Sequence, residues 1–434
     1  MVEEETRRSP FWFIRGNVLV LMACRVLWGM STSIVYPFFS LYILALGGTT
    51  AEVGLINSIG ILAGMILYPV GGYIADRAGR VKLIGYSTIF YAFSHLFFLF
   101  ATNWQVIAVG QFFSQLLLFY MPAMNALEAD SLPPGVRGKG FALIMAVPST
   151  IRIVAPYIGG WIIAAYGGGD EGIVQAIRIC WGIATITGFI VAGIRLKYLK
   201  ETVQTKEHNS FKLSDIPNTV INGYTSIVES IKWMNKTLRY IVLIEILAAF
   251  AVSTNSPFWV VYAKEVLGLT AYDWGVVLLI SGAVGILVAF PMGSLVDKVG
   301  PRKMILVGLL MTPPLVFLFQ FAGGFIGVVL IVSGISIVNN IIMPAFSTII
   351  ANLISKERRG RLYSLLGERG IQISFGNFWG GGFLIFPSAA LGAFIGGQVY
   401  AINPVYPMMI LSSVMTLALI LSYFYLHEPK EIHH

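Results

Sequence analysis

Long apolar runs separated by short polar segments dominate this chain. The runs hold roughly 20 to 28 residues, and a helix of about 20 apolar residues crosses the ~30 Å hydrocarbon core of a bilayer. We see none of the alternation typical of barrel strands, so we expect helices, which satisfy their own backbone groups in lipid. The pattern predicts twelve spans, at about 17–46, 52–74, 82–101, 104–129, 139–166, 173–196, 239–266, 273–296, 303–322, 325–353, 361–397 and 402–426.

The two halves of the chain repeat each other at an offset of about 220 to 222 residues. Parallel repeats of this kind place a binding site near the middle of the membrane, between the halves. We expect an N-terminal six-helix bundle (1–198), a cytoplasmic linker (199–236) and a C-terminal six-helix bundle (237–434). The matching pairs are Pro37-Phe38 with Pro257-Phe258, Gly72-x-x-x-Asp76 with Gly293-x-x-x-Asp297, Met121-Pro122-Ala123 with Met343-Pro344-Ala345, Arg137-Gly138 with Arg359-Gly360, and Gly159-Gly160 with Gly381-Gly382.

Composition and charge placement agree with a membrane protein. Hydrophobic residues make up 56% of the chain and charged residues 12%, against about 25% charged in soluble domains. Most of the 29 Lys and Arg residues fall at the termini and in the loops on one side of the predicted membrane. This asymmetry predicts a multi-pass protein of the cell membrane with both termini in the cytoplasm, and it explains the net charge of +8 without nucleic acid.

A glycine-rich basic loop follows the second predicted span, with the sequence GGYIADRAGRVK. It resembles the signature loop of the major facilitator superfamily, G-x-x-x-D-R-x-G-R-R/K, and the second half carries a similar GSLVDKVGPRK. The resemblance implies an all-α fold of two pseudo-symmetric six-helix bundles that transports by alternating access. The residues that match or flank the two loops and that we expect to act in gating are Gly72, Asp76, Arg77, Gly79, Arg80, Asp297, Arg302, Glu128, Asp130 and Arg137.

The gating expectation has a physical basis and an alternative. Asp76 at a helix end can pair with Arg80 and with a facing helix N-terminus, which would latch the cytoplasmic side shut. Glu128 and Asp130 can pair with Arg137, Arg77 or Arg80, or they can simply lie at the solvated end of the fourth span. Alternatively, the basic residues only enforce topology.

The fifth span contains Pro156, Gly159 and Gly160 in the order A-P-Y-I-G-G. This is similar to the tail of the G-P-x-x-G-G pattern of the antiporter branch, although Ala155 replaces the first glycine. The resemblance implies export in exchange for a cation. Ordinary close packing at the glycine pair would account for the same residues.

Charged residues inside the spans are candidates for substrate binding or proton coupling, because each costs about 2.5–3.5 kcal/mol at the centre of a membrane helix. Arg152 is expected in a central cavity, in contact with an anionic or polar substrate, or in a structural salt bridge. Glu245 can alternate between protonated and charged forms as its access changes, or it can form a lasting ion pair with Arg25. The adjacent Glu368 and Arg369 point about 100° apart on a helix and cannot share one partner.

Polar and aromatic residues of the spans are expected to line the cavity, namely Tyr36, Gln111, Gln115, Asn125, Asn255, Trp259, Asn339, Asn340 and Asn377. The sequence contains no nucleotide-binding loop, metal-ligand cluster or nucleophile arrangement, so we expect no catalytic residue, cofactor or metal. The expected partners are a small-molecule substrate, protons and the lipid bilayer, for a chain acting as a monomer.

The leading hypothesis is a secondary active transporter, a proton-coupled exporter of small organic or amphipathic compounds. One alternative is a proton-linked importer or facilitator of a polar metabolite, such as an organic acid or a sugar. Another is a sensor, scaffold or lipid-flipping protein on the same fold. The charges within the spans favour coupled transport over a scaffold, whose interior has no need of them.

The Asp76→Asn variant tests the gating hypothesis. If Asp76 latches the cytoplasmic side, loss of its charge slows turnover in a transport assay while the amount of protein in the membrane stays normal. Unchanged turnover at equal expression would leave only the topological explanation.

Overall fold

A computed structural model of the chain describes residues 11–133, 136–202, 234–353, 365–367, 370–376 and 382–427, with single residues between 217 and 232. Within these ranges, the side chains of 68–78, Gly138 and Ala351 are not described. The described residues that form regular structure are helical.

The first half of the chain folds into one group of helices. Its first, fourth and fifth spans are each broken by a short irregular or 3₁₀ segment. The elements are α2 (Asn17–Ser33), η1 (Tyr36–Phe38), α3 (Phe39–Ala45), α4 (Thr50–Ala78), α5 (Arg80–Leu99), α6 (Trp104–Leu116), η2 (Leu117–Tyr120), α7 (Met121–Ser131), α8 (Arg137–Arg152), α9 (Ala155–Ala165) and α10 (Asp170–Tyr198).

The second half folds into a second group, in which the seventh span is broken at the position that matches the break in the first. The elements are α12 (Lys236–Asn255), η5 (Ser256–Phe258), α13 (Trp259–Glu265), α14 (Ala271–Val299), α15 (Pro301–Phe319), α16 (Gly324–Leu353), α18 (Ile385–Ile402) and α19 (Tyr406–Tyr425).

Eleven helical segments of the described chain are long and apolar enough to cross a membrane. The segment α5, which matches the third predicted span, is 20 residues long but is not among them. Its sequence includes Lys82, His95 and several hydroxyl side chains, which lower its mean hydropathy. The structure therefore supports a multi-pass helical protein, with one span fewer by this criterion than the sequence predicts.

The prediction of one continuous helix over 361–397 is wrong. Residues 370–376 have no helical structure, and α18 starts only at Ile385 and runs to Ile402. Gly367, Gly370 and Gly376 have φ of 87°, 60° and 113°, a region that glycine enters without steric cost. We call residues 370–376 the irregular segment.

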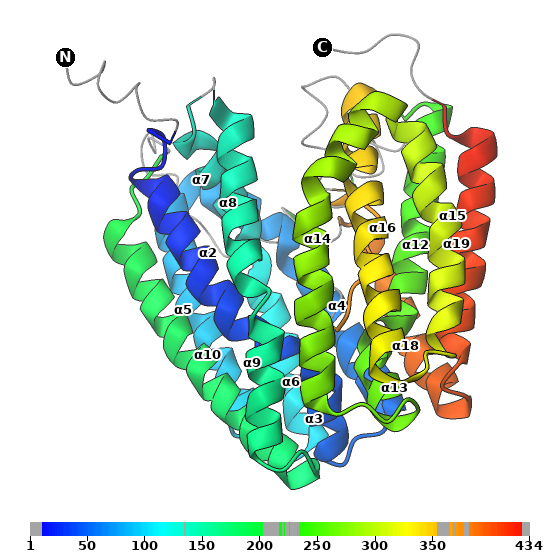
Figure 1. Ribbon diagram of the computed structural model, residues 1–434. Helices are drawn as coiled ribbons and strands as arrows, with labels where there is room; N and C mark the ends of the chain where they lie inside the picture. Colours follow the sequence, from blue (N-terminus) through cyan, green and yellow to red (C-terminus); the bar gives the residue numbers. More distant parts are fainter. Residues whose placement is uncertain are drawn as a thin grey trace.

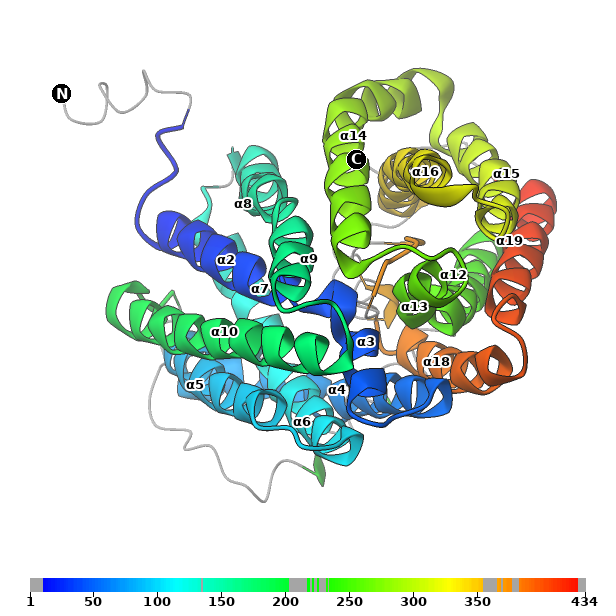
Figure 2. The same ribbon diagram turned by 60° about the horizontal axis from the view of Figure 1, so that its bottom comes forward.

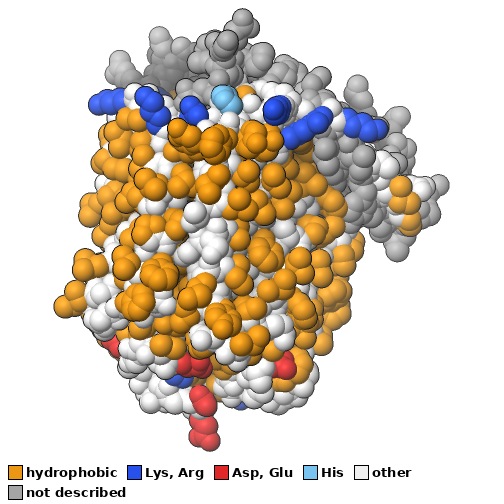
Figure 3. Space-filling view, turned by 90° about the vertical axis from the view of Figure 1, so that its right-hand side faces the viewer, with side chains coloured by type: hydrophobic (Ala, Val, Ile, Leu, Met, Phe, Trp, Pro, Cys, Tyr) orange, Lys and Arg blue, Asp and Glu red, His pale blue; other side chains and the backbone are white. Residues whose placement is uncertain are grey.

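The two groups of helices stand side by side and diverge toward one end (Figure 1). At that end α2 begins and α19 ends, and Lys and Arg gather there above an apolar surface on the face shown in Figure 3. Asp and Glu gather at the opposite end of the same face. We call these ends the basic end and the acidic end.

Matching local signals start and stop the second helix of each group. Thr49 and Glu52 form a capping box at the start of α4, and Thr270 and Asp273 form one at the start of α14. Gly79, with φ of 89°, ends α4 and leads directly into α5. Gly300, with φ of 97°, does the same between α14 and α15. The signature-loop glycines therefore make two equivalent tight turns at the basic end.

The two groups meet through close backbone contacts at glycines. A Cβ on Gly54 would lie 2.5 Å from the carbonyl oxygen of Ala393 and 2.7 Å from the Cα of Gly397, so α4 and α18 touch backbone to backbone. A Cβ on Gly160 would lie 2.6 Å from the carbonyl oxygen of Ala271, and a Cβ on Gly275 would lie 2.6 Å from the carbonyl oxygen of Pro156. These contacts join α9 to α14. Figure 2, with the acidic end toward the viewer, shows both pairings, α4 with α18 and α9 with α14.

These contacts correct the repeat alignment in the fifth and eleventh spans. A Cβ on Gly159 would collide with the carbonyl of Ile34, and one on Gly396 would collide with the carbonyl of Thr254, the repeat partner of Ile34. Likewise, Gly397 abuts the carbonyl of Thr50, just as Gly160 abuts that of Ala271. The structural counterpart of Gly159-Gly160 is therefore Gly396-Gly397, fifteen residues beyond Gly381-Gly382. An insertion in the eleventh span, which includes the irregular segment, accounts for the difference.

Substitution of Gly160 tests the importance of these contacts. We expect Gly160→Val to push α9 away from α14, because even a Cβ alone stands 2.6 Å from a carbonyl oxygen. Spin labels at Glu171 and Glu265, which lie at the acidic end in different groups, would report a longer distance. Gly193→Val in α10 is the matched control, since a Cβ there meets nothing within 4 Å. Equal distances in both variants would contradict the expectation.

Candidate functional site

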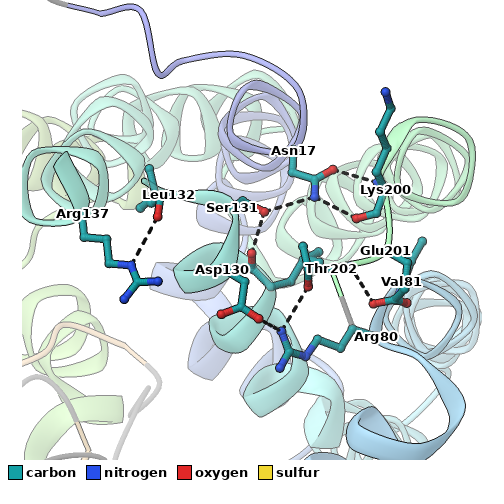
Figure 4. A network of polar contacts seen from close by, with 11 residues as sticks. Asn17, Arg80, Val81, Asp130, Ser131, Leu132, Arg137, Lys200, Glu201 and Thr202 are labelled. Carbon is teal, nitrogen blue, oxygen red and sulfur yellow. Dashed lines mark hydrogen bonds and ion pairs between the residues drawn. The ribbon is translucent and has the colours of Figure 1, made fainter. Parts of the chain in front are cut away.

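A polar network at the basic end ties the segment after α10 to three helices of the first group (Figure 4). Arg80, at the start of α5, donates from Nη1 to Asp130 of α7 at 2.5 Å and to the hydroxyl of Thr202 at 3.1 Å. The carboxylate of Glu201 accepts from the N–H of Val81 at 3.0 Å, at the free N-terminus of α5. A Cβ on Gly79 would stand 3.0 Å from Glu201 Oε2, so the carboxylate packs tightly against this glycine.

Asn17 completes the network at the start of α2. Its amide accepts from the N–H of Lys200 at 2.7 Å and donates to the Lys200 carbonyl at 2.8 Å and the Ser131 hydroxyl at 3.1 Å. Figure 4 shows Asn17 between Ser131 and Lys200. The beginning of the first span is thereby fixed to the ends of the fourth and the sixth.

Further predicted gating residues lie at the same end of the molecule. The guanidinium of Arg137 donates to the carbonyl of Leu132 at 3.3 Å, and that of Arg302 to the carbonyl of Tyr423 at 3.0 Å. Asp297 is exposed near the end of α14. Gly72, Asp76 and Arg77 lie in the last two turns of α4, where side chains are outside the described part.

An ion pair lies inside the first group, deeper than the network. Arg25 of α2 donates to Glu128 of α7 from Nη2 at 2.6 Å and from Nε at 2.9 Å, and Met145 of α8 lies 3.7 Å from Nη1. Glu128 is 1% exposed. One expectation is corrected: Arg25 pairs with Glu128 and not with Glu245. Glu128 itself is buried next to α2.

Arg152 lies where the fifth span is broken between α8 and α9. The side chain is exposed, and its Cδ packs against Gly29 of α2, 3.4 Å from the position of a Cβ there. The next residue, Ile153, packs against Gly282 of α14 in the other group. The break therefore sits between the two groups.

Sequence reasoning missed a second interior arginine, Arg195. It is 4% exposed, donates to the hydroxyl of Thr88 at 2.6 Å and to that of Tyr120 at 3.4 Å, and lies over the Tyr120 ring at 5.6 Å. The predicted sixth span ends at residue 196, directly after Arg195, but α10 continues to Tyr198. Thr88 and Tyr120, polar side chains near the same depth of neighbouring spans, were the available signal.

Glu245 is an isolated carboxylate in the second group. It lies in α12, is 4% exposed, and neither carboxylate oxygen has a hydrogen-bond partner in the described structure. Its Oε1 lies 3.6 Å from the position of a Cβ on Gly370, the first residue of the irregular segment. Glu368 and Arg369, which directly precede that glycine, lie outside the described residues.

The irregular segment is hydrogen-bonded to α16 and to η5. The Asn339 amide of α16 makes two bonds to Ile373, donating to its carbonyl at 2.9 Å and accepting from its N–H at 3.0 Å. Ser256 of η5 bonds the Ser374 hydroxyl at 2.8 Å, and its carbonyl accepts from the N–H of Gly376 at 3.0 Å. Non-helical backbone at membrane depth needs such partners, since lipid supplies none.

The same segment also reaches the first group. A Cβ on Gly376 would stand 3.1 Å from the carbonyl oxygen of Tyr36 in η1. Close by, the hydroxyl of Ser40 donates to the carbonyl of Pro257 in η5 at 2.7 Å. The breaks of the first, seventh and eleventh spans therefore meet between the two groups.

The predicted cavity-lining residues divide by exposure. Tyr36, Gln111, Asn255 and Trp259 are buried, with Gln111 packed on Gly60 of α4 and Trp259 against Phe319 and Phe375. Gln115, Asn125 and Asn340 are partly exposed, and Asn340 bonds the carbonyl of Ser336 in its own helix. Asn377 lies outside the described residues.

Two repeated groups of membrane-length helices, with charged side chains inside them and broken spans between them, define a multi-pass membrane transporter. The chain belongs to the Major Facilitator Superfamily, whose sequence profile matches residues 21–375 and 241–434. It is accordingly a secondary transporter for small molecules, and the family is not a family of enzymes.

Relatives of similar length extend this comparison. The chain is 25% identical over 395 residues to multidrug resistance protein 2 of Bacillus subtilis, covering 89% of this chain and 88% of the relative. It is 24% identical over 364 residues to multidrug resistance protein MdtG of Salmonella arizonae, covering 82% and 85%. A bacterial homologue of the human lysosomal transporter Spinster, solved in an inward-facing and occupied conformation, has the same fold, with a TM-score of 0.69, 15% identity and coverage of 94% and 95%.

Neighbouring asparagines of α16 allow a controlled test of the irregular segment. Asn339→Ala leaves the N–H and carbonyl of Ile373 without their partner, at about 1–3 kcal/mol for each buried unsatisfied group. Asn340→Ala removes only a side-chain bond within the helix. We expect thermal unfolding in detergent at a clearly lower temperature for the first variant. Equal midpoints would contradict a role for Asn339 in holding the segment.

Proposed function

We propose that the chain exports small organic or amphipathic compounds across the cell membrane in exchange for protons, acting as a monomer with twelve membrane spans. Two observations support export. The relatives at 24–25% identity are named multidrug resistance proteins. The Pro156, Gly159 and Gly160 motif resembles the tail of the antiporter pattern, and its Gly160 lies at the contact between the groups.

The transport cycle we propose is alternating access between residues 1–198 and 237–434, with 199–236 as the cytoplasmic linker. The concentration of Lys and Arg at the basic end supports a cytoplasmic position for that end and for both termini. The groups touch backbone to backbone at the acidic end and diverge toward the basic end, an arrangement that opens to the cytoplasm. Rocking of the two groups about the broken spans would close the basic end and open the acidic end.

Glu245 is the group we assign to the proton, and its environment is the observation that carries the proposal. A buried carboxylate without a hydrogen-bond partner is stable only when protonated or when a cation replaces the proton. Arg25 and Glu128 already neutralise each other, so they supply no free charge for coupling. Arg152, exposed between the groups, is the side chain we assign to the polar or anionic part of a substrate.

The decisive experiment compares proton movement in purified wild type and Glu245→Gln. In liposomes with an imposed pH gradient, we expect wild type to couple the transport of a multidrug-type compound to proton flux. Glu245→Gln, which removes the titratable group and keeps the shape, should abolish the response to the gradient while substrate exchange without a gradient persists.

Glu171→Gln at the exposed start of α10 is the control and should behave as wild type. Proton flux that persists unchanged in Glu245→Gln would exclude this residue as the coupling group. Proton-driven accumulation in the direction of import, for sugars or organic acids only, would favour the importer instead.

A further inference from the structure

A cavity at the basic end lies at the start of α12, outside the candidate site. Its volume is about 550 Å³, and the described residues that line it are Met234, Lys236, Arg239, Tyr240 and Leu243. The last four recur at spacings of three and four along the helix, so they share one face of α12. The cavity is large enough for a small-molecule group.

The described lining of the cavity carries two cations and no carboxylate. Lys236 and Arg239 are exposed and form no ion pair in the described structure. Arg239 has one long bond, from Nη2 to the carbonyl of Lys232 at 3.4 Å, and Lys236 Nζ lies 5.9 Å from the centre of the Tyr425 ring. Both cations are therefore available to an anion, beside the positive N-terminal end of α12.

The walls below the cations are aromatic and apolar. Tyr240 stacks flat on Tyr425 of α19, with ring centroids 3.9 Å apart, and amphipathic rings of this kind are enriched at the membrane interface. Leu243, one turn further into the membrane, is 41% exposed. In Figure 3, the Lys and Arg side chains likewise sit directly above apolar surface on the face that it shows.

We propose that this cavity binds the phosphate headgroup of an anionic phospholipid, with the acyl chains extending past Leu243. Lys236 and Arg239 contact the phosphate oxygens, and Tyr240 packs against the glycerol region. Basic pockets at the cytoplasmic side of helix pairs are suited to anionic headgroups. A lipid would cover the apolar surface of Tyr240 and Leu243 next to the cations, whereas a soluble anion would make no contact with it. The inference does not depend on the direction of transport.

The test uses the purified full chain in detergent and measures its thermal unfolding against added short-chain phosphatidylglycerol or phosphatidylcholine. A ligand that binds only the folded state raises the midpoint in a saturable way. We expect phosphatidylglycerol to do so and phosphatidylcholine not. In the Lys236→Gln/Arg239→Gln variant the half-saturating concentration should rise about 25-fold, since each cation contributes about a factor of five.

The control is Lys298→Gln/Lys303→Gln, two exposed cations of the basic end that do not line the cavity, and it should respond as wild type. If the double variant does not fold, each single substitution should shift half-saturation about fivefold. Equal responses to both lipids, or an unshifted Lys236/Arg239 variant, would overturn the proposal. Inorganic phosphate that matches the effect of phosphatidylglycerol would overturn it in favour of a soluble anion.

Discussion

The direct approach of backbone to backbone between the two helix groups is the contact on which the rest of the arrangement depends. At Gly54 with Gly397, and at Gly160 with Gly275, no side chain stands between the helices, so the groups are held at the closest separation that helices reach. Larger residues would separate the groups by the width of a side chain. The contacts occupy equivalent positions in the two repeats, and they leave the basic end free of this constraint. A tilt of one group about these points changes access at that end without remodelling either bundle.

The sequence was enough to predict the class of fold because membrane spans produce long apolar runs and a duplication leaves matching motifs at a constant offset. The prediction was wrong where the second half no longer matches the first residue by residue. Up to Arg359-Gly360 the offset holds, and the next glycine pair in register, Gly381-Gly382, looked like the partner of Gly159-Gly160. Only the contacts with the carbonyls of Ile34 and Thr254 identify Gly396-Gly397 as the true counterpart. An insertion within an apolar, glycine-rich stretch gives no sequence signal that separates helix from irregular backbone.

The candidate site was harder to predict, because partners of charged residues are chosen by the rotation and depth of helices and not by their order. The repeat suggested Arg25 for Glu245, yet α2 packs near α7 and presents Arg25 to Glu128 instead. The predicted sixth span ends one residue beyond Arg195, and a helix that continues to Tyr198 places this arginine further inside. An error of two residues in a span boundary is therefore enough to move a charged side chain from the aqueous end into the interior.

The pairing of Arg25 with Glu128 also makes the two halves electrically different. Among the described residues, the first group encloses the pair of Arg25 with Glu128 and also Arg195, Arg152 lies between the groups, and the second group encloses the carboxylate of Glu245. A proton on Glu245 therefore changes the charge inside the second group. The carboxylate lies six residues from Arg239, or about 9 Å along α12, and beside the irregular segment that contacts Tyr36. Glu245 thus lies against a segment that contacts both groups, and under the proposed coupling this segment would carry the effect of its charge from one group to the other.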